Sequence, residues 1–347
     1  MLALQAITPA ALESALGILP GEARKIVAAV HRGDWGLGPL ACRGVRRVAL
    51  DAAKVNGHVP ALTLQSVRRS ALDPFIKFAL AAPDGRRFEA VRIPLERAGR
   101  FSACVSSQAG CALACAFCAT GGLGLSRNLA TWEIVEQVRV VRSTLGPGQR
   151  VHGVVFQGMG EPLANVDRVI DAVRVMCEPC ALAIDARAIT VCTAGLPSGI
   201  RRLARELPKV RLGLSISSAR PDVRRRLMPI DDVHPLDEVV CAAEEHAQTT
   251  GLSPMWAVTP LLGINDTEED ARALVALIRR FEARAGVRPR LSLVPYNAID
   301  DPSRDPFKRG DVAAFAAHLI ACGVHPHIRY SGGADVAAAC GQLVGSA

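Results

Sequence analysis

From residue 100 onward, the chain alternates between short apolar runs of strand length and longer segments whose apolar residues recur at helical spacing. Consecutive parallel strands need a long crossover, usually a helix, so this alternation predicts a parallel sheet covered by helices. The expected strands are 101–106, 151–157, 188–192, 210–216, 254–259 and 290–294. The expected helices are 131–145, 165–176, 198–207, 235–250 and 267–285. Six repeats are fewer than the eight of a closed barrel, so we predict an α/β fold with a partial (βα)6 barrel, open on one side.

The first hundred residues follow a different order, with helical spacing first and strand-like runs after it. The expected elements are helices 9–19 and 21–32 and strands 61–69, 75–82 and 88–94. We therefore predict a small α+β accessory domain over residues 1–95 and a core domain over residues 96–347. In the core, Thr267 and Asp270 are spaced as a capping box at the start of the last expected helix.

Positive charge is concentrated in the N-terminal part of the chain. Residues 1–100 hold 15 Lys and Arg against 8 Asp and Glu, whereas the other residues hold 26 against 25. This asymmetry predicts that the first domain contacts a polyanion, most commonly a nucleic acid. With 36 Arg and 5 Lys, the composition is also compatible with codon bias alone, which leaves a non-functional explanation open.

Signals for membrane insertion or export are missing from the sequence. No run approaches the ~18 consecutive apolar residues of a membrane span. The N-terminus contains Glu13 and lacks a basic leader. The expected location is therefore the cytoplasm, without membrane contact.

Four of the eleven cysteines lie within fifteen residues, in CVSSQAGCALACAFC. An odd number of unevenly spaced cysteines disfavours a secreted disulfide framework. The spacing Cys111-x3-Cys115-x2-Cys118 suits a metal or an iron-sulfur cluster. Tetrahedral zinc would require a fourth ligand, and none has similar local spacing. Three thiolates on a four-iron cluster leave one iron open to a substrate; zinc and three unrelated buried cysteines are weaker alternatives.

Three separate motifs extend this observation. They are CVSSQAGCALACAFCATG from Cys104, GMGEP at 158–162 and AACGQL at 338–343. In this order they resemble the RlmN/Cfr family of radical S-adenosylmethionine (SAM) enzymes, which methylate adenine in RNA. The similarity extends from about Phe75 to the C-terminus.

The resemblance implies a 4Fe-4S cluster on Cys111, Cys115 and Cys118, with SAM bound at the open iron. Two SAM molecules would be used per turnover, one as methyl donor and one as source of a 5′-deoxyadenosyl radical. The implied product is adenine methylated at ring carbon 2, expected over carbon 8, in ribosomal RNA and, as in dual-specificity relatives, in transfer RNA. The implied partners are RNA and an electron donor such as flavodoxin or ferredoxin, and the enzyme is expected to be a monomer.

Further residues acquire roles from the same resemblance. Cys340 would carry the methyl group as S-methylcysteine. Cys104 would release the product by attacking the Cys340 sulfur and forming a transient disulfide, a reaction typical of thiolates. Glu89 matches the family's proton acceptor, with an exposed strand glutamate as the alternative. The implied SAM contacts, near the C-terminal ends of predicted strands where ligands collect, are Gly160, Glu161, Cys192, Ser215, Ile216, Ser217 and Asn297.

Two departures from the family pattern bear on the RNA target. Ser217 occupies the position of a family histidine, and Tyr330-Ser331-Gly332-Gly333 replaces a turn with threonine, arginine and glycine. Two alternatives therefore stay open: a radical SAM methylase of a peptide or small metabolite, and a non-catalytic iron-sulfur or zinc protein that binds RNA. The basic N-terminal domain argues against the first, and the presence of both Cys104 and Cys340 argues against the second.

Two other pairs have spacings found in metal or redox sites. Cys177 and Cys180 lie at a predicted helix end without a partner pair, so a site there is disfavoured. His325 and His327 alternate on a predicted strand and are interpreted as a solvated face.

Overall fold

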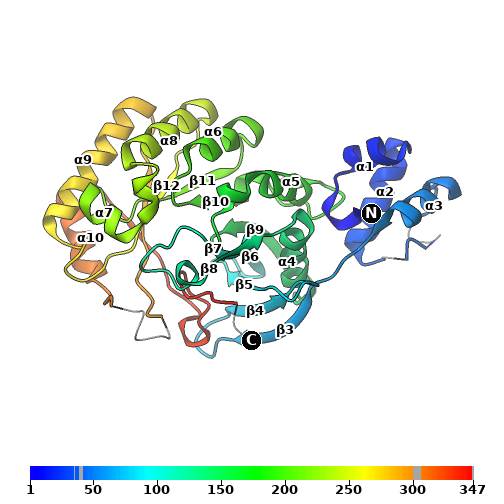
Figure 1. Cartoon of the computed structure of the whole chain (residues 1–347), viewed down its shortest axis with the longest axis horizontal. Coiled ribbons are helices and arrows are strands. Elements are labelled where there is room, and N and C mark those ends of the chain that lie inside the picture. Colours follow the sequence, from blue (N-terminus) through cyan, green and yellow to red (C-terminus); the bar gives the residue numbers. More distant parts are fainter. Residues whose placement is uncertain (35, 39–41, 300–305, 346–347) are drawn as a thin grey trace.

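The computed structural model describes residues 1–34, 36–38, 42–299 and 306–345 (Figure 1). Within these residues, ten strands form one large sheet. Their order across it is β14 (His327–Ile328), β13 (Arg290–Leu293), β12 (Met255–Val258), β11 (Arg211–Ser215), β10 (Ile189–Thr193), β9 (Arg150–Phe156), β6 (Arg100–Cys104), β5 (Arg87–Pro94), β4 (Ile76–Ala81) and β3 (Thr63–Arg69).

The half of this sheet from β6 to β14 is parallel. The helices that connect its strands are α4 (Thr131–Ser143), α5 (Val166–Cys177), α6 (Pro197–Glu206), α8 (Leu236–Thr250), α9 (Glu268–Ala285) and α10 (Val312–Ala321). Because β14 and β3 end the sheet at different edges, the parallel half does not close on itself. The predicted α/β fold with an open, partial barrel is confirmed.

Helix α9 illustrates how the sequence produces these helices. Leu274, Ile278 and Phe281 recur at helical spacing and are buried, and the Phe281 ring packs 5.1 Å from that of Trp256 on β12. The helix begins at the expected capping box, in which Thr267 Oγ1 accepts a hydrogen bond from the Asp270 amide at 3.2 Å.

The antiparallel half of the sheet belongs to the same structure as the core. Strand β5 pairs with β6 in antiparallel register, with Val91 opposite Cys104, so β3 to β5 continue the core sheet. The domain boundary expected at residue 95 therefore falls between β5 and β6, which pair in the same sheet. The helices that lie apart from the sheet, at one end of the molecule in Figure 1, are α1 (Pro9–Leu16), α2 (Pro20–Arg32) and α3 (Arg47–Asn56), accompanied by the short strands β1 (Leu2–Ala3) and β2 (Gly57–His58).

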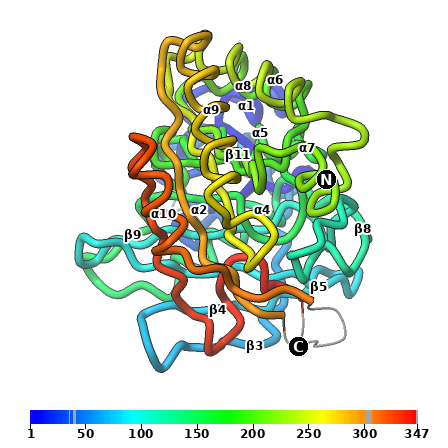
Figure 2. Tube along the Cα trace, turned by 90° about the vertical axis from the view of Figure 1, so that its left-hand side faces the viewer, coloured from blue at the N-terminus to red at the C-terminus, as the bar shows by residue number. Residues whose placement is uncertain are grey.

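Several elements were not expected from the sequence. The hairpin of β7 (Gln108–Cys111) and β8 (Gly124–Asn128) encloses the other cysteines of the CxxxCxxC motif, and α7 (Pro221–Leu227) follows β11. The C-terminal segment, residues 330–345, turns back toward β4 and β5 (Figure 2). No helix in the described ranges has the length and apolar character to span a membrane.

Candidate active site

One cavity lies at the C-terminal ends of the parallel strands, where ligands collect in this type of fold. Its lining brings together residues from loops far apart in the chain. The expected site residues that line it are Cys111, Cys115, Cys118, Gly160, Glu161, Cys192, Ser215, Ser217, Asn297 and Cys340. Of the other expected residues, Ile216, Cys104 and Glu89 are not among its lining residues.

The three cysteines of the CxxxCxxC motif lie on a tight loop. Cys111 ends β7, and the Cys118 amide donates a hydrogen bond to the Cys115 carbonyl at 3.1 Å. Gly121 makes this turn possible, since a Cβ there would lie 2.9 Å from the Cys115 carbonyl oxygen. Burial raises the pKa of Cys111 to about 11 and raises that of Cys115 further, so bare thiolates are unfavourable here.

This donor set fits an iron-sulfur cluster better than a single ion. Among the described residues, no three His, Cys, Asp or Glu side chains are grouped closely enough to hold one metal ion. A four-iron cluster takes each thiolate on a different iron, so it requires three sulfurs around a shared space. Cys111, Cys115 and Cys118 meet this requirement because all three line the same cavity.

The GMGEP segment follows β9 in the chain and packs against the loop that follows β6. A Cβ at Gly158 would lie 2.7 Å from the Val105 carbonyl, and one at Gly160, whose φ is +95°, would collide with the Gln108 side chain. The Gln108 Oε1 accepts a hydrogen bond from the Glu161 amide at 2.8 Å. The glycines are therefore required for the close approach that places Glu161 at the cavity.

Glu161 places a buried carboxyl group at the surface of the cavity. Its carboxylate accepts hydrogen bonds from the amides of Leu163 at 2.9 Å and Ala194 at 2.8 Å. Burial nevertheless raises the pKa of this carboxyl to about 7, and the two hydrogen bonds only partly oppose the shift. A cationic group in the cavity would stabilise the ionised form.

The last residue of β11, Ser215, and Ser217 in the loop that follows line the cavity, while Ile216 between them is fully buried. Ile216 therefore contacts the cavity through backbone at most. Cys192 lies on β10 beside this loop, and burial raises the pKa of its thiol to about 12. Asn297 follows β13, and its Nδ2 donates a hydrogen bond to the Cys340 carbonyl at 3.2 Å. These loops thus meet the C-terminal segment directly.

Cys340 lines both this cavity and a second one that also includes Cys104 and Arg329. Cys340 is exposed to the solvent of the cavities, whereas Cys104, at the end of β6, is 7% exposed. Burial raises the pKa of the Cys104 thiol, and the Arg329 guanidinium opposes this shift. Both cysteines are free thiols.

Glu89 lies behind the C-terminal segment. It is fully buried on β5, with Oε1 3.2 Å from the Lys77 ammonium and Oε2 accepting a hydrogen bond from the Val344 amide at 3.1 Å. The alternative of an exposed strand glutamate is therefore wrong, because the side chain is buried between β4 and the C-terminal segment.

The two disfavoured pairs lie outside the main cavity, although His327 lines the second cavity together with Cys104 and Cys340. Cys177 and Cys180 are half-buried and pack against the hydrophobic core. His325 and His327 are exposed, as expected for a solvated face. Neither pair contributes to the lining of the main cavity.

Comparison with known proteins identifies the class first. Residues 105–278 match the model of the radical SAM superfamily, and the described fold with its three-cysteine loop agrees with that match. The chain is therefore a radical SAM enzyme, and enzymes of this class use a 4Fe-4S cluster and SAM.

The relatives identify the family within this class. The chain is 59% identical to a probable RNA methyltransferase of Sorangium cellulosum, over 96% of this chain and 90% of that protein. It is 40% identical to the dual-specificity RNA methyltransferase RlmN of Syntrophobacter fumaroxidans, over 80% of this chain and 78% of the relative. A radical SAM methyltransferase from Sphaerobacter thermophilus matches with a TM-score of 0.87 at 32% identity, covering 100% of both chains. The chain belongs to the RlmN family of radical SAM RNA methyltransferases.

Proposed function

We propose that this enzyme methylates a ring carbon of adenine, carbon 2 in preference to carbon 8, in ribosomal RNA and in transfer RNA. The observation that carries the proposal is the position of Cys340, which lines the same cavity as the three cysteines of the CxxxCxxC loop and Glu161. The names of the dual-specificity relatives support an RNA substrate.

The cavity residues divide into two groups. Cys111, Cys115 and Cys118 would hold the cluster, and the Glu161 carboxylate would bind the ammonium group of SAM. The remaining proposed SAM contacts are Gly160, Cys192, Ser215, Ile216, Ser217 and Asn297. When bound, the cluster and SAM together supply a methyl group and a 5′-deoxyadenosyl radical.

Cys340 carries the carbon to the base. Its thiolate would accept the methyl group of one SAM, and the 5′-deoxyadenosyl radical from the other SAM would take a hydrogen atom from the resulting S-methyl group. The carbon radical left on Cys340 would add to adenine, and the adduct would then give up one electron to the oxidised cluster and the proton of the attacked ring carbon to a base. This addition joins the enzyme to the RNA. Such a route suits an aromatic carbon that is too weak a nucleophile to attack SAM directly.

Cys104 releases the product. Its thiolate would attack the Cys340 sulfur, the bond from that sulfur to the methylene carbon would break, and the electron pair of the bond would pass to that carbon, which would take up a proton to become the methyl group on the base. The two cysteines are left as a disulfide, which a dithiol reductant returns to thiols. Their shared position on the second cavity supports this pairing.

Glu89 is proposed as the proton acceptor in the same release step. Its carboxylate binds the Val344 amide behind the C-terminal segment, four residues beyond Cys340. Glu89→Gln would then slow product formation while leaving iron content and SAM cleavage unchanged. A normal rate in this variant would remove the role.

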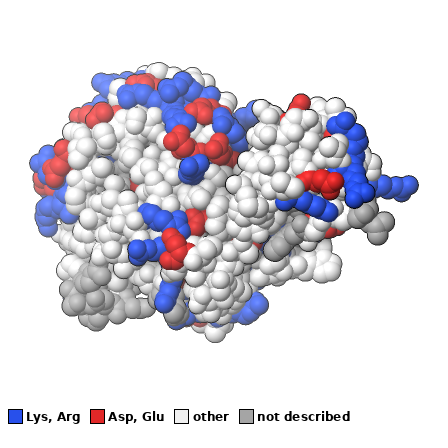
Figure 3. Space-filling model, turned by 45° about the vertical axis from the view of Figure 1, so that its right-hand side comes forward, with Lys and Arg blue, Asp and Glu red and all other residues white. Residues whose placement is uncertain are grey.

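The N-terminal helices are the proposed RNA-binding surface within the basic accessory region of residues 1–95. Figure 3 shows basic side chains over this end of the molecule, and the exposed ones include Arg24, Lys25, Arg43, Arg47 and Lys54. RNA affinity would therefore fall as salt rises, because bound phosphates release counterions. A flat salt response would favour a peptide or small-metabolite substrate.

The cellular setting follows the family. We propose a monomeric enzyme that acts in the cytoplasm and receives its electrons from a flavodoxin or ferredoxin.

Expression in a host without a family member tests the proposal. Ribosomal and transfer RNA are separated, and 2-methyladenosine and 8-methyladenosine are quantified by mass spectrometry, with Cys340→Ala as the control. We expect methyladenosine only with intact Cys340. If neither nucleoside forms although the enzyme holds its cluster and cleaves SAM, another substrate must replace RNA.

A further inference from the structure

Three consecutive backbone carbonyls in the loop after β11 are each bound by a buried side chain from a later part of the chain. Arg224 Nη1 donates hydrogen bonds to the carbonyls of Ser215, at 2.9 Å, and Ile216. Asn265 Nδ2 donates to the Ser217 carbonyl at 2.7 Å. Neither Arg224 nor Asn265 lines the cavity.

Arg224 connects two strand ends through one guanidinium. This side chain of α7 is fully buried, and its Nη2 donates to the Ala194 carbonyl, just after β10, at 2.9 Å. Its Nε lies 2.8 Å from Asp231, which balances the buried charge. The planar fork of arginine allows all these bonds at once, which a lysine could not make.

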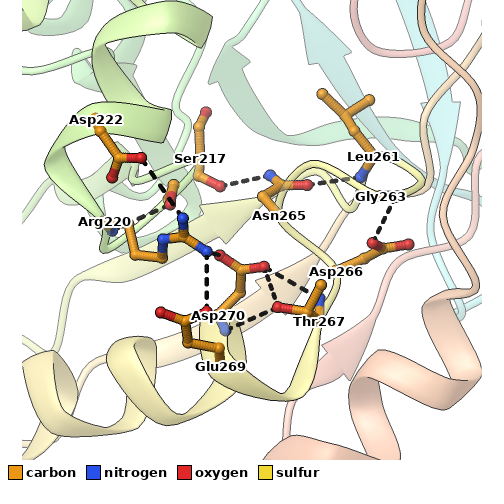
Figure 4. Close-up of polar contacts among 11 residues, drawn as sticks. Ser217, Arg220, Asp222, Leu261, Gly263, Asn265, Asp266, Thr267, Glu269 and Asp270 are labelled. Carbon is orange, nitrogen blue, oxygen red and sulfur yellow. Dashed lines mark hydrogen bonds and ion pairs between the residues drawn. The ribbon is translucent and has the colours of Figure 1, made fainter.

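Asn265 connects the same loop to the one after β12 (Figure 4). Besides the Ser217 carbonyl, its Nδ2 binds the Thr259 carbonyl at 3.0 Å, and its Oδ1 accepts a hydrogen bond from the Leu261 amide at 2.7 Å. With 1% of the residue exposed, the amide group has no competing contact with water. Both its donor and its acceptor are therefore committed to backbone.

The loop needs this support because Ser217 adopts a left-handed conformation, with φ at +58°. Residues with a Cβ adopt this conformation only at a cost. From the other side, the Ala257 carbonyl accepts hydrogen bonds from the amides of Ile216 at 2.9 Å and Ser217 at 3.4 Å. With the backbone held on both sides, Ser215 and Ser217 keep their places in the lining of the cavity.

We propose that Arg224 and Asn265 are positioning residues that hold the loop Ser215–Ser217 in its SAM-binding conformation and thereby set SAM affinity without touching SAM. The inference rests on the SAM contacts proposed above. Such supporting residues around a site typically change affinity by ~10- to 100-fold when altered.

Asn265→Asp tests the proposal with almost no change in volume. It keeps an acceptor for the Leu261 amide but replaces the donor with an oxygen that repels the carbonyls of Ser217 and Thr259. We expect the dissociation constant of SAM, measured by equilibrium dialysis on the cluster-loaded enzyme, to rise about tenfold. Arg224→Lys is expected to act in the same direction.

Two neighbours provide matched controls. Asp266→Asn alters a half-buried residue that binds the Gly263 amide at 2.8 Å, and Arg225→Lys alters an exposed partner of Asp232 on the same helix as Arg224. Both are expected to bind SAM within about twofold of the parent enzyme. Iron content and melting temperature are measured on every variant.

A second readout is the electron paramagnetic resonance spectrum of the reduced cluster, with and without SAM. Asn265→Asp should reduce the spectral change that SAM causes at subsaturating concentrations, with the SAM-free spectrum unchanged. Parent-like SAM affinity in a folded Asn265→Asp variant would overturn the inference, even if Arg224→Lys does not fold.

The double variant Ser215→Ala/Ser217→Ala separates the inference from the site on which it rests. If the double variant weakens SAM binding and Asn265→Asp does not, only the positioning role fails. If the double variant binds SAM normally, the assignment of the loop is wrong and the inference fails with it.

Discussion

The cavity has two sides that are held in different ways. On one side, the loop Ser215–Ser217 directly extends a buried strand and is fixed by Arg224 and Asn265, which are almost completely buried. On the other side, Cys340 lies in the C-terminal segment, where the described residues between 330 and 345 form only one three-residue 3-10 turn, Ala334–Val336. The side with the proposed SAM contacts, called the cofactor side, is therefore part of the barrel core, whereas the side with Cys340, the proposed methyl carrier, is attached to it.

The attachments of the first part of the C-terminal segment, residues 330–335, lie closer to solvent than those of residues 340–344, where Thr120 donates a buried hydrogen bond to the Leu343 carbonyl and Val344 binds the buried Glu89. Asp73 accepts hydrogen bonds from the Gly333 amide at 2.9 Å and the Tyr330 hydroxyl at 3.0 Å. Asp335 accepts one from the exposed Ala71 amide at 2.9 Å. Segments with few buried contacts and exposed hydrogen bonds open locally at lower cost. The difference indicates that residues 330–335 open more easily than the loop Ser215–Ser217, close to Cys340, which lines both the main cavity and the cavity of Cys104.

The largest expected effect is the loss of the cluster, which should affect one side of the cavity and leave the other unchanged. Cys118→Ala removes one of three cluster ligands, so the iron-sulfur absorbance and SAM cleavage should be lost. Cys340→Ala should retain both and lose only RNA methylation. Absorbance and 5′-deoxyadenosine formation measure this contrast, and normal SAM cleavage by Cys118→Ala would refute the ligand assignment.

Cys104→Ala should stop turnover after the base has been attacked. The release step is then missing, so RNA should remain covalently joined to Cys340. Denaturing electrophoresis, followed by nuclease digestion and peptide mass spectrometry, detects the adduct. An active variant free of adduct would exclude Cys104 as the resolving residue.

Folding stability and SAM affinity should both depend on pH through the Glu161 carboxyl on the cofactor side. Burial raises the pKa of its carboxyl from 4.5 to about 7. Between these two pH values, the folded state therefore holds a proton that the unfolded state has lost. The stability contributed by this proton is present at low pH and disappears as pH rises to about 7. Because the ammonium group of SAM favours the ionised carboxylate, SAM affinity should rise about eightfold from about pH 6 to about pH 7.5.

Glu161→Gln provides the control for this effect. The variant cannot ionise, so its weaker SAM binding should be flat over the same pH range. Equilibrium dialysis at several pH values makes the comparison. An unchanged pH profile in Glu161→Gln would assign the dependence to another group.

The smallest effect concerns the attachment of the C-terminal segment. Asp73→Asn weakens the acceptor for Gly333 and Tyr330, so amides of residues 331–345 should exchange hydrogen faster while global stability changes by less than ~1 kcal/mol. Asp84→Asn is the matched control, since this turn carboxylate binds Arg127 instead. Equal exchange in both variants would mean that Asp73 does not hold the segment.

The parallel half of the fold could be predicted because each strand and helix has its own local pattern. The pairing of β5 with β6 could not, since strand-like runs do not reveal which sheet they join. Hairpin β7–β8 was missed because its glycines and cysteines replace the alternation of a strand. Helix α10, by contrast, is apolar and Ala-rich over Val312–Ala321, a composition that could have indicated it.

Residues of the candidate site that lie in recognisable motifs could be predicted from the sequence. Residues that are defined only by their three-dimensional contacts could not. The cluster cysteines, Glu161 and Cys340 lie in recognisable motifs. Arg224 stands in a run of three arginines, and only the structure distinguishes the buried one from its exposed neighbours. Asn265 precedes an aspartate and has the composition of an ordinary turn, so nothing local indicates its contacts with two loops.

The central claim is that the carbon added to RNA passes through Cys340. The direct measurement begins with enzyme whose Cys340 carries a deuterated methyl group, obtained by growth on labelled methionine, followed by one turnover with unlabelled SAM and RNA. The account predicts deuterium in the first methyladenosine formed and its loss from the Cys340 peptide. Unlabelled methyladenosine in that first turnover, with the label still on Cys340, would contradict it.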